Sequence, residues 1–262
     1  MANSVRQPSD TSGCWIRLLC VLLLVFSTVC SANDEQALAV AEQRIRESLS
    51  EFMAHSTSPK IHSSFSLTHE RPPQGGGIVA EMERFIYLII QDSNQLQSDY
   101  IADLESAGWF QFYDYERLWA DTEFKQSRKI IRDARAAVGR YEDDYWALFD
   151  IALDRIQDMR VSATEQLFFE RSFQLGIEQG RSTGDRYIEL EFSYLTVAGD
   201  IVDYLQNING QWAVELNQMY FENEKLANKF NFFLDRIDGI YADQAEIDSR
   251  RMEMIDTMFL FD

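Results

Sequence analysis

The hydrophobic positions in the last part of the chain are spaced as in a long helix that packs lengthwise against other helices. From Leu226 they recur in alternating steps of four and three residues, which is heptad spacing. They are Leu226, Phe230, Phe233, Ile237, Ile240, Gln244, Ile247, Arg251, Met254 and Met258. Gln244 and Arg251 are the two polar interruptions of this stripe. The pattern predicts a scaffold helix.

Apolar positions at helical spacing also predict helices in the first part of the chain. These predicted helices cover residues 33–54, 78–106 and 115–160. Residues 55–77 separate the first two and are rich in Ser, Pro and Gly, so they are predicted to form a flexible linker. The third pattern is long, and we expect Gly139 or the acidic run at residues 142–144 to bend or split it.

Two more helices are predicted between the third pattern and the C-terminal stretch. Ser162 is a favourable N-cap, and Glu165 three residues later completes a capping box. This helix is expected to end near Gly180. Asp185 then caps the next helix, which is expected to run to about Asn207.

One short stretch departs from the helical period. Residues 211–221 alternate between large apolar and small or polar side chains, and Asn217 in their middle tolerates a left-handed turn. We predict a small β-hairpin there, with Asn223 as the N-cap of the last helix. The alternative is a continuous helix, because Trp212, Leu216 and Met219 also fall at helical spacing. The whole pattern predicts an all-α fold, an elongated antiparallel bundle of about five to six long helices with one small β-hairpin insert, in which residues 78–262 form the bundle domain.

The N-terminus carries an apolar run that predicts export. Leu18 to Cys30 is almost unbroken in hydrophobicity and is preceded by two arginines, as in a signal peptide. We expect residues 1–32 to be a signal peptide that is cleaved before Asn33. Two alternatives remain open: the segment stays in place as a signal anchor, or Cys30 is lipidated.

Cysteine usage and charge agree with an exported protein. All 3 cysteines lie within residues 1–32, so the exported chain has no disulfide and depends on a packed core. The protein is predicted to be periplasmic, or anchored facing the periplasm by its uncleaved or lipidated N-terminus. Its net charge of −19 disfavours binding to nucleic acid. Membrane contact is expected only through the N-terminal segment.

The three histidines are the first candidates for metal binding. His55, His62 and His69 are spaced seven residues apart in the predicted linker. No cysteine accompanies them, and the spacing differs from the short-range patterns of zinc sites. No histidine has a glutamate three residues before it, which excludes the Glu-x-x-His pairs of di-iron bundles. We interpret them as linker histidines.

Residues 180–184 match the G-x-S-x-G motif that exposes a nucleophilic serine in hydrolases. The motif is meaningful only between a strand and a helix, and here a helical pattern precedes Ser182. All three histidines also lie before Ser182, whereas in that fold the histidine comes last. We interpret the motif as a helix end followed by a turn.

The remaining candidates for acid–base chemistry are carboxylates. Glu142, Asp143 and Asp144 form one cluster, and Asp200 and Asp203 form another. Adjacent acidic residues on a helix point in different directions, so both clusters are interpreted as solvated faces.

Aromatic residues offer two further possibilities. Trp109, Trp119, Trp146 and Trp212 are of a kind that lines ligand pockets, but in a Phe-rich bundle such residues usually belong to the core. The apolar run from Met258 to Phe261 is a candidate contact for a partner or a membrane component. It also has the composition to pack on its own bundle.

No catalytic, cofactor-binding or metal-binding residue is predicted, and we expect no enzymatic activity. The leading hypothesis is an exported helical protein of the cell envelope with a structural or protein-interaction role. Its expected partner is an envelope protein or a second copy of the chain. The alternative is a ligand-sensing or carrier domain with an aromatic-lined cavity between helices.

Overall fold

The computed structural model of the chain describes Gln43 and residues 77–258, with side chains described up to residue 250. Gln43 is helical. The predicted signal peptide, the rest of the predicted helix at 33–54, the three histidines and Phe259 to Phe261 lie outside the described residues. The side chain of Met258 also lies outside them.

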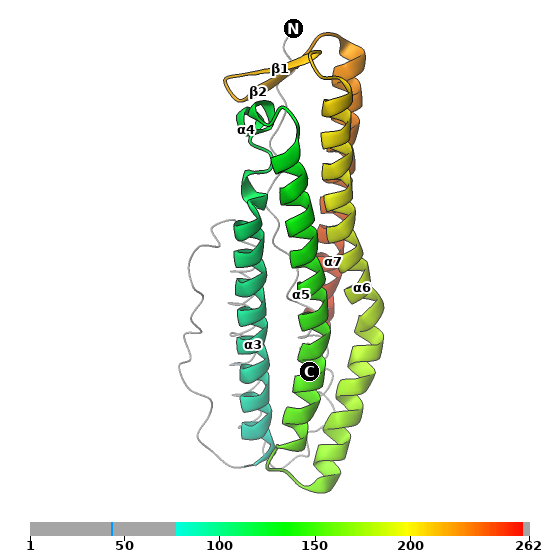
Figure 1. The fold of residues 1–262 in the computed structure, drawn as a ribbon. Helices are drawn as coiled ribbons and strands as arrows, with labels where there is room; N and C mark the ends of the chain where they lie inside the picture. The colour runs from blue at the N-terminus through cyan, green and yellow to red at the C-terminus, as the bar shows by residue number, and fades with distance from the viewer. Residues whose placement is uncertain (1–42, 44–76, 259–262) are drawn as a thin grey trace. The chain divides into compact units, whose positions relative to one another are not determined.

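The predicted all-α fold with a hairpin insert is confirmed (Figure 1). Residues 77–258 contain five α-helices, one short 3₁₀ helix and a two-stranded antiparallel sheet. The elements are α3 (Ile78–Ala107), η1 (Trp109–Gln111), α4 (Tyr115–Ala120), α5 (Lys125–Gln157), α6 (Ala163–Asn207), β1 (Trp212–Glu215), β2 (Gln218–Phe221) and α7 (Glu224–Met258). None of these helices has the length and hydropathy that a membrane span requires.

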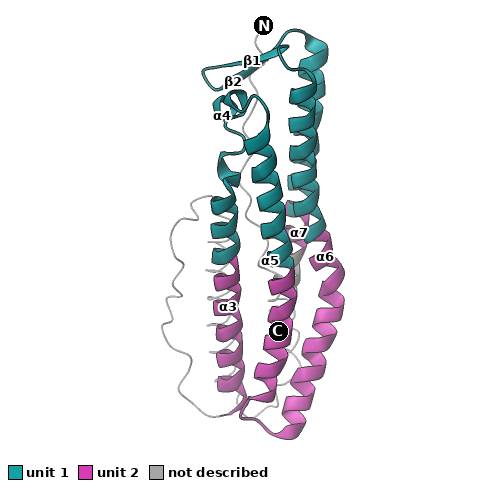
Figure 2. Cartoon of the chain, viewed as in Figure 1, with its two compact units in different colours: residues 1–10, 98–142, 188–244 teal, residues 11–97, 143–187, 245–262 magenta. Residues whose placement is uncertain are grey.

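The described residues form two compact units (Figure 2). Unit 1 contains residues 98–142 and 188–244, and unit 2 contains residues 77–97, 143–187 and 245–258. The core of unit 1 includes the fully buried Phe112, Tyr115, Tyr141 and Phe230. The core of unit 2 includes Ile89, Ile90 and Phe173, and the Phe173 ring meets Phe85 edge-on at 5.8 Å. Each unit therefore buries apolar side chains from several helices, as the stripes predicted.

The predicted break in the third helical pattern is at the wrong place. The chain leaves the helix at residues 121–124 and then continues through Gly139 and the acidic run without interruption in α5. Asp121 marks the break, because its carboxylate accepts hydrogen bonds from the N–H of Ser127 at 2.7 Å and of Gln126 at 3.3 Å. Phe124 takes a positive φ of 53° and is buried. A cap and a buried aromatic anchor decide this boundary.

The predicted end of a helix near Gly180 is also wrong. Residues 163–207 form one continuous helix, α6, so Gly180 and Gly184 lie in its interior and Asp185 does not cap a new helix. An interior glycine costs about 1 kcal/mol relative to alanine. Burial of Phe173 and Tyr187 on either side of the two glycines favours the continuous helix over a turn.

Two of the three predicted helix starts, at Ser162 and Asn223, are confirmed by their hydrogen bonds. The Ser162 N–H donates to Glu165 Oε2 at 2.7 Å, and the Glu165 N–H donates to Ser162 Oγ at 3.3 Å, which is the reciprocal capping box. Asn223 Oδ1 accepts from the Leu226 N–H at 3.1 Å at the start of α7. Both caps could be predicted from the sequence, because each one joins residues that are three positions apart.

The predicted hairpin is confirmed as well, so the helical alternative for this stretch is wrong. Trp212 pairs with Phe221 and Glu215 pairs with Gln218. The two turn residues between the strands, Leu216 and Asn217, have φ values of 51° and 54°. This left-handed turn suits the twist of a two-residue hairpin.

Candidate interaction surface

The structure places the candidate nucleophile in the interior of a helix. Ser182 lies within α6 and is exposed to solvent. The strand–turn–helix geometry that strains and activates such a serine is therefore not present at residues 180–184. Among the described residues, no group of three or more His, Cys, Asp or Glu side chains is arranged to hold a metal ion.

The candidate carboxylates Asp200 and Asp203 take part in ion pairs. Asp200 Oδ2 lies 2.7 Å from Arg236 Nη1, and Asp203 Oδ1 lies 2.6 Å from Arg128 Nη2. The four side chains are between 38% and 58% exposed, so solvent screens both pairs. Both contacts link helices within unit 1.

The tryptophans pack mainly against other aromatic rings. Trp109 is buried and stacks on Phe112 at 5.1 Å. Trp212 is buried, meets Trp119 edge-on at 4.9 Å, and donates its ring N–H to the carbonyl of residue 205 at 3.2 Å. Trp146 lies under the Arg181 guanidinium at 4.6 Å. Burial assigns Trp109 and Trp212 to the core of unit 1, as predicted, whereas the same prediction is wrong for Trp119, which is 42% exposed.

A buried polar cluster in unit 1 escaped the sequence analysis. Glu191 on α6 is only 6% exposed, and its carboxylate accepts a hydrogen bond from Gln244 Nε2 at 2.9 Å and from the Tyr100 hydroxyl at 3.1 Å. Burial raises the pKa of the neighbouring Tyr194 hydroxyl well above its usual value. The polar interruption at Gln244 was the one signal in the sequence that pointed to this cluster.

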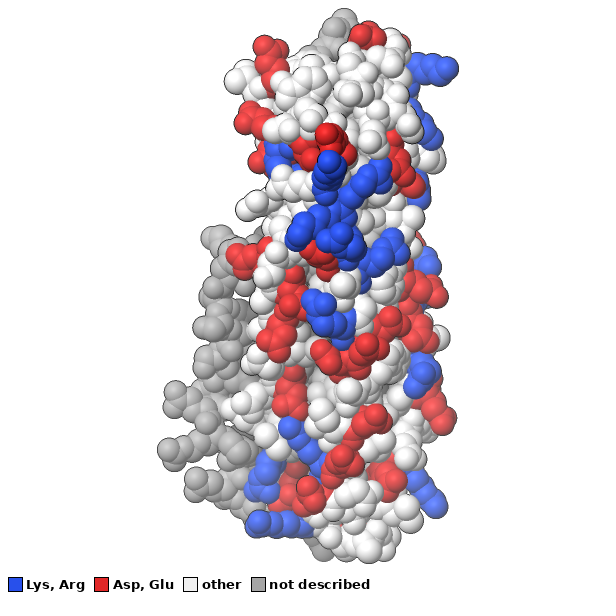
Figure 3. All heavy atoms as spheres, viewed as in Figure 1, with Lys and Arg blue, Asp and Glu red and all other residues white. Residues whose placement is uncertain are grey.

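The other feature that sequence analysis missed is a basic surface on α5. Six exposed basic residues lie on the first half of this helix: Lys125, Arg128, Lys129, Arg132, Arg135 and Arg140. Figure 3 shows Lys and Arg side chains gathered over this part of α5. Residues 125–140 contain these six basic residues and one acidic residue, Asp133, so their net charge is +5. The whole chain, by contrast, carries −19.

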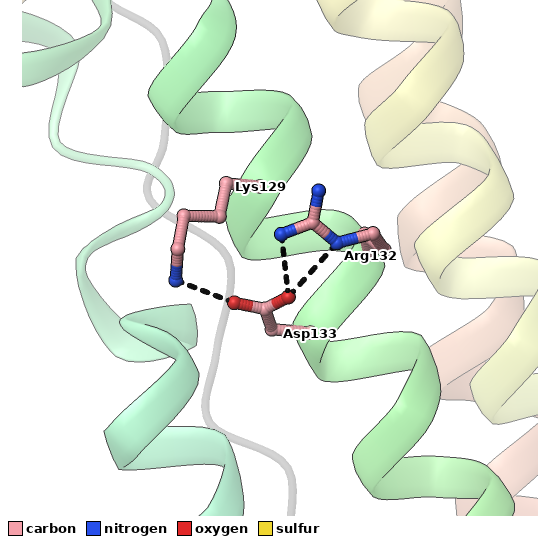
Figure 4. A network of polar contacts seen from close by, with 3 residues as sticks. All are labelled: Lys129, Arg132 and Asp133. Atoms are coloured by element: carbon pink, nitrogen blue, oxygen red, sulfur yellow. Dashed lines mark hydrogen bonds and ion pairs between the residues drawn. The ribbon is translucent and has the colours of Figure 1, made fainter.

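All six basic residues of this surface have partners in the chain, and two of them, Arg128 and Arg135, bond residues of α6. Lys129 Nζ lies 2.6 Å from Asp133 Oδ2, and Arg132 Nη2 lies 3.0 Å from Asp133 Oδ1 (Figure 4). Hydrogen bonding from Lys129 lowers the pKa of the Asp133 carboxyl. Desolvation opposes this effect, and the hydrogen bond from Arg132 adds to it. Arg140 pairs with Asp103 at 2.7 Å. Exposed pairs of this kind are individually weak and exchange readily with other partners.

The second half of α5 has the opposite charge. Residues 142–157 contain five acidic residues and one basic residue, a net charge of −4. Asp143, Asp144, Asp150 and Asp154 are all exposed, and no ion pair joins any of the four within the described part of the chain. This agrees with the predicted solvated face, and it extends that face over a longer stretch than residues 142–144.

This order of charges opposes the intrinsic preference of a helix. A helix favours acidic side chains near its N-terminus and basic ones near its C-terminus. The first turn of α5 has no acidic residue and begins with Lys125. Like charges four residues apart, such as Lys125 with Lys129 and Asp150 with Asp154, destabilise a helix by a few tenths of a kcal/mol per pair. The stability of α5 as a helix therefore does not explain its charge pattern.

Comparison with known proteins supplies no family for this chain. It matches no family model, no curated protein and no solved structure.

Proposed function

We propose that the protein is a non-enzymatic interaction protein of the cell envelope and binds another protein through the outward face of α5. The observation that carries this proposal is the segregation of charge along one exposed helix: +5 over residues 125–140 and −4 over residues 142–157. Segregated surface charge steers association and selects partners of complementary pattern.

Burial and pairing support a binding role over a role in the fold for most of these residues. Arg128 and Arg135 are the exceptions, because they bond Asp203 and Thr196 on α6. The six basic side chains and the four exposed aspartates point away from the apolar core, whose α5 residues include Ala134, Tyr141, Tyr145 and Ala152. The ion pairs of Lys129, Arg132 and Arg140 lie at the surface, so they contribute little to the stability of the fold. A protein partner that brings opposite charges to this face would replace them.

The location in this proposal is supported by the sequence. The apolar run from Leu18 to Cys30 has the length and the flanking arginines of a signal peptide, and all three cysteines lie in that segment. Intact-mass analysis of the protein from a fractionated native host tests the location. A soluble chain that begins at Asn33, or a membrane-bound chain that is full-length or acylated at Cys30, supports export. A full-length chain in the cytosolic fraction contradicts it.

The interaction itself is tested by photo-crosslinking in the native host. A photoreactive amino acid replaces Ala136, an exposed residue in the basic half of α5, in the full chain. A matched control carries it at Gln179, which is exposed on α6. We expect a discrete protein adduct at position 136 that weakens with added salt. No adduct at position 136, or the same adduct at both positions, would overturn the proposal.

A further inference from the structure

We propose that the partner of α5 is α5 of a second copy of this chain, paired antiparallel in a two-fold symmetric dimer. This inference rests on the proposed function, since it identifies the protein that the outward face binds. A two-fold interface brings the same surface of both copies together, so the surface must be complementary to itself. The charge order of α5 meets that requirement, because the basic half of one copy can face the acidic half of the other.

The outermost positions of α5 show the complementarity residue by residue. With one exception all of them are exposed, and they follow one another in steps of three or four, so they form one stripe along the helix. They are Lys125, Lys129, Arg132, Ala136, Gly139, Asp143, Ala147, Asp150 and Asp154, with Gly139 half-buried. The stripe reads as three cations, two small residues, and then three anions around one further small residue.

A two-fold axis beside Gly139 brings opposite charges together. With two antiparallel helices centred there, Lys125 of one copy lies opposite Asp154 of the other, and Lys129 lies opposite Asp150. Symmetry repeats both contacts, which makes four charge pairs.

The middle of the stripe permits close approach of the two helices. A Cβ atom added at Gly139 would meet nothing within 4 Å in its own chain, so no internal contact requires a glycine there. Glycine in the interior of an exposed helix is less favourable than alanine. The distance between the axes of packed helices depends on the side chains at their crossing point. The small residues Gly139 and Ala136 at that point permit a short interaxial distance.

Parallel pairing and other partners fit less well. In a parallel pair the cations of one copy would face the cations of the other, and the aspartates would face aspartates, which is repulsive. A purely acidic partner would engage only Lys125 to Arg140 and would leave the four unpaired aspartates unused. The second copy uses both halves of the helix, so it is the occupant that the charge order favours.

Charge reversal on the full chain tests the inference. The basic-reversed variant carries K125E, K129E and R132E, and the acidic-reversed variant carries D143K, D150K and D154K. The swapped variant carries all six changes and restores complementarity with the polarity inverted. Because the substitutions place acids near the start of α5 and bases near its end, they do not oppose helix formation. Circular dichroism checks that each variant is folded.

Sedimentation velocity at low and high salt reads out the mass of each variant. We expect a wild-type dimer at about 50 mM salt that dissociates at about 0.5 M, where the Debye length falls to a few ångströms. The basic-reversed variant and the acidic-reversed variant should each dimerise at least about tenfold more weakly than the wild type. An equimolar mixture of the two should form a heterodimer, and the swapped variant should dimerise by itself.

Three outcomes overturn the inference: a wild-type monomer at low salt, a dimer indifferent to salt and to reversal, or a swapped variant that stays monomeric. G139L should weaken the dimer, whereas G239L, at an exposed helical glycine on α7, should leave it unchanged. The photo-crosslinking result distinguishes failure of the self-pairing inference from failure of the proposed interaction role. An adduct at position 136 with a different protein would refute self-pairing and retain the interaction role, and no adduct at all would refute both.

Discussion

Gln244 on α7 donates a hydrogen bond of 2.9 Å from Nε2 to Oε1 of Glu191 on α6, and both residues are buried. Gln244 occupies a position in the heptad stripe where an apolar residue would otherwise lie. Tyr100 on α3 donates to the other carboxylate oxygen at 3.1 Å, so the cluster links three helices of unit 1. Polar groups at such positions can define the register of a helix relative to its neighbours.

Replacing Gln244 by leucine should lower the free energy of unfolding by about 1–3 kcal/mol, because the buried Glu191 carboxylate loses a donor. Urea denaturation measures the change, and Gln179→Leu on the exposed face of α6 is the control, with an expected effect below about 0.5 kcal/mol. The double variant Glu191→Leu/Gln244→Leu should cost less than the sum of the single changes. Equal losses for Gln244→Leu and the control would contradict a coupled pair.

The hairpin turn stores backbone strain at Leu216. This side chain is 88% exposed and its φ is 51°, a conformation that a branched residue without local hydrogen bonds adopts at a cost of about 1–2 kcal/mol. Leu216→Asn should therefore raise the free energy of unfolding by about 0.5–1 kcal/mol, since asparagine tolerates this region. Thermal unfolding measures the gain, and a lower midpoint than wild type would show that Leu216 makes a stabilising contact.

The next turn residue, Asn217, has two roles that substitutions can separate. Its Oδ1 accepts a hydrogen bond from the Tyr115 N–H at 3.1 Å, and its φ is also positive. Asn217→Gly should keep the turn and lose about 1 kcal/mol with the hydrogen bond, whereas Asn217→Ala should lose more because it also strains the backbone. Chemical denaturation of both variants gives the order, and equal losses would assign the whole effect to the hydrogen bond.

The hydroxyl of Tyr115 is a buried polar group with no hydrogen-bond partner in the described part of the chain. The residue is 2% exposed, and burial raises the pKa of its hydroxyl to about 12. Tyr115→Phe should raise the free energy of unfolding by about 1 kcal/mol, because it removes an unsatisfied group at constant shape. Tyr220→Phe, which removes the exposed hydroxyl that donates to Gln218 Oε1, is the control. A loss of stability for Tyr115→Phe exceeding that of the control would reveal a partner for this hydroxyl.

The capping box at the start of α6 predicts a pH dependence. Hydrogen bonding by the Ser162 side chain, and then by its backbone N–H, lowers the pKa of Glu165 below its ordinary value of 4.5. A carboxyl with a lowered pKa in the folded state contributes its stability above pH 4.5 and loses it as the pH falls through the folded pKa.

Glu165→Gln should therefore be less stable than wild type near neutral pH, and the difference should shrink at about pH 3. Denaturation at both pH values measures this, with Glu178→Gln on the exposed face of the same helix as the control. A difference that stays constant between the two pH values would mean that the charge of Glu165 has no part in the cap.

Local patterns were sufficient for most of the fold. The apolar stripe from Leu226 predicted α7, Ser162 with Glu165 predicted the start of α6, and Asn217 marked the hairpin turn. Each of these signals depends on residues a few positions apart in the chain, where helix and strand geometry relate spacing to direction. The function has no such local signal, since no catalytic motif in its proper context occurs in the sequence.

Other features depended on contacts between distant residues. The glycines at 180 and 184 stay helical because packing on either side outweighs their poor propensity, and α5 begins where Asp121 caps it and Phe124 is buried. The Glu191 carboxylate lies beside Tyr100 and Gln244, 91 and 53 residues away. Periodicity shows that a position faces the core, but the partner it meets depends on how the helices pack. The sequence by itself determined the helical class of the fold, the hairpin and the charge of each segment. Only the tertiary structure decided which polar groups are buried together and which face of α5 remains open, because burial is a property of the packed chain.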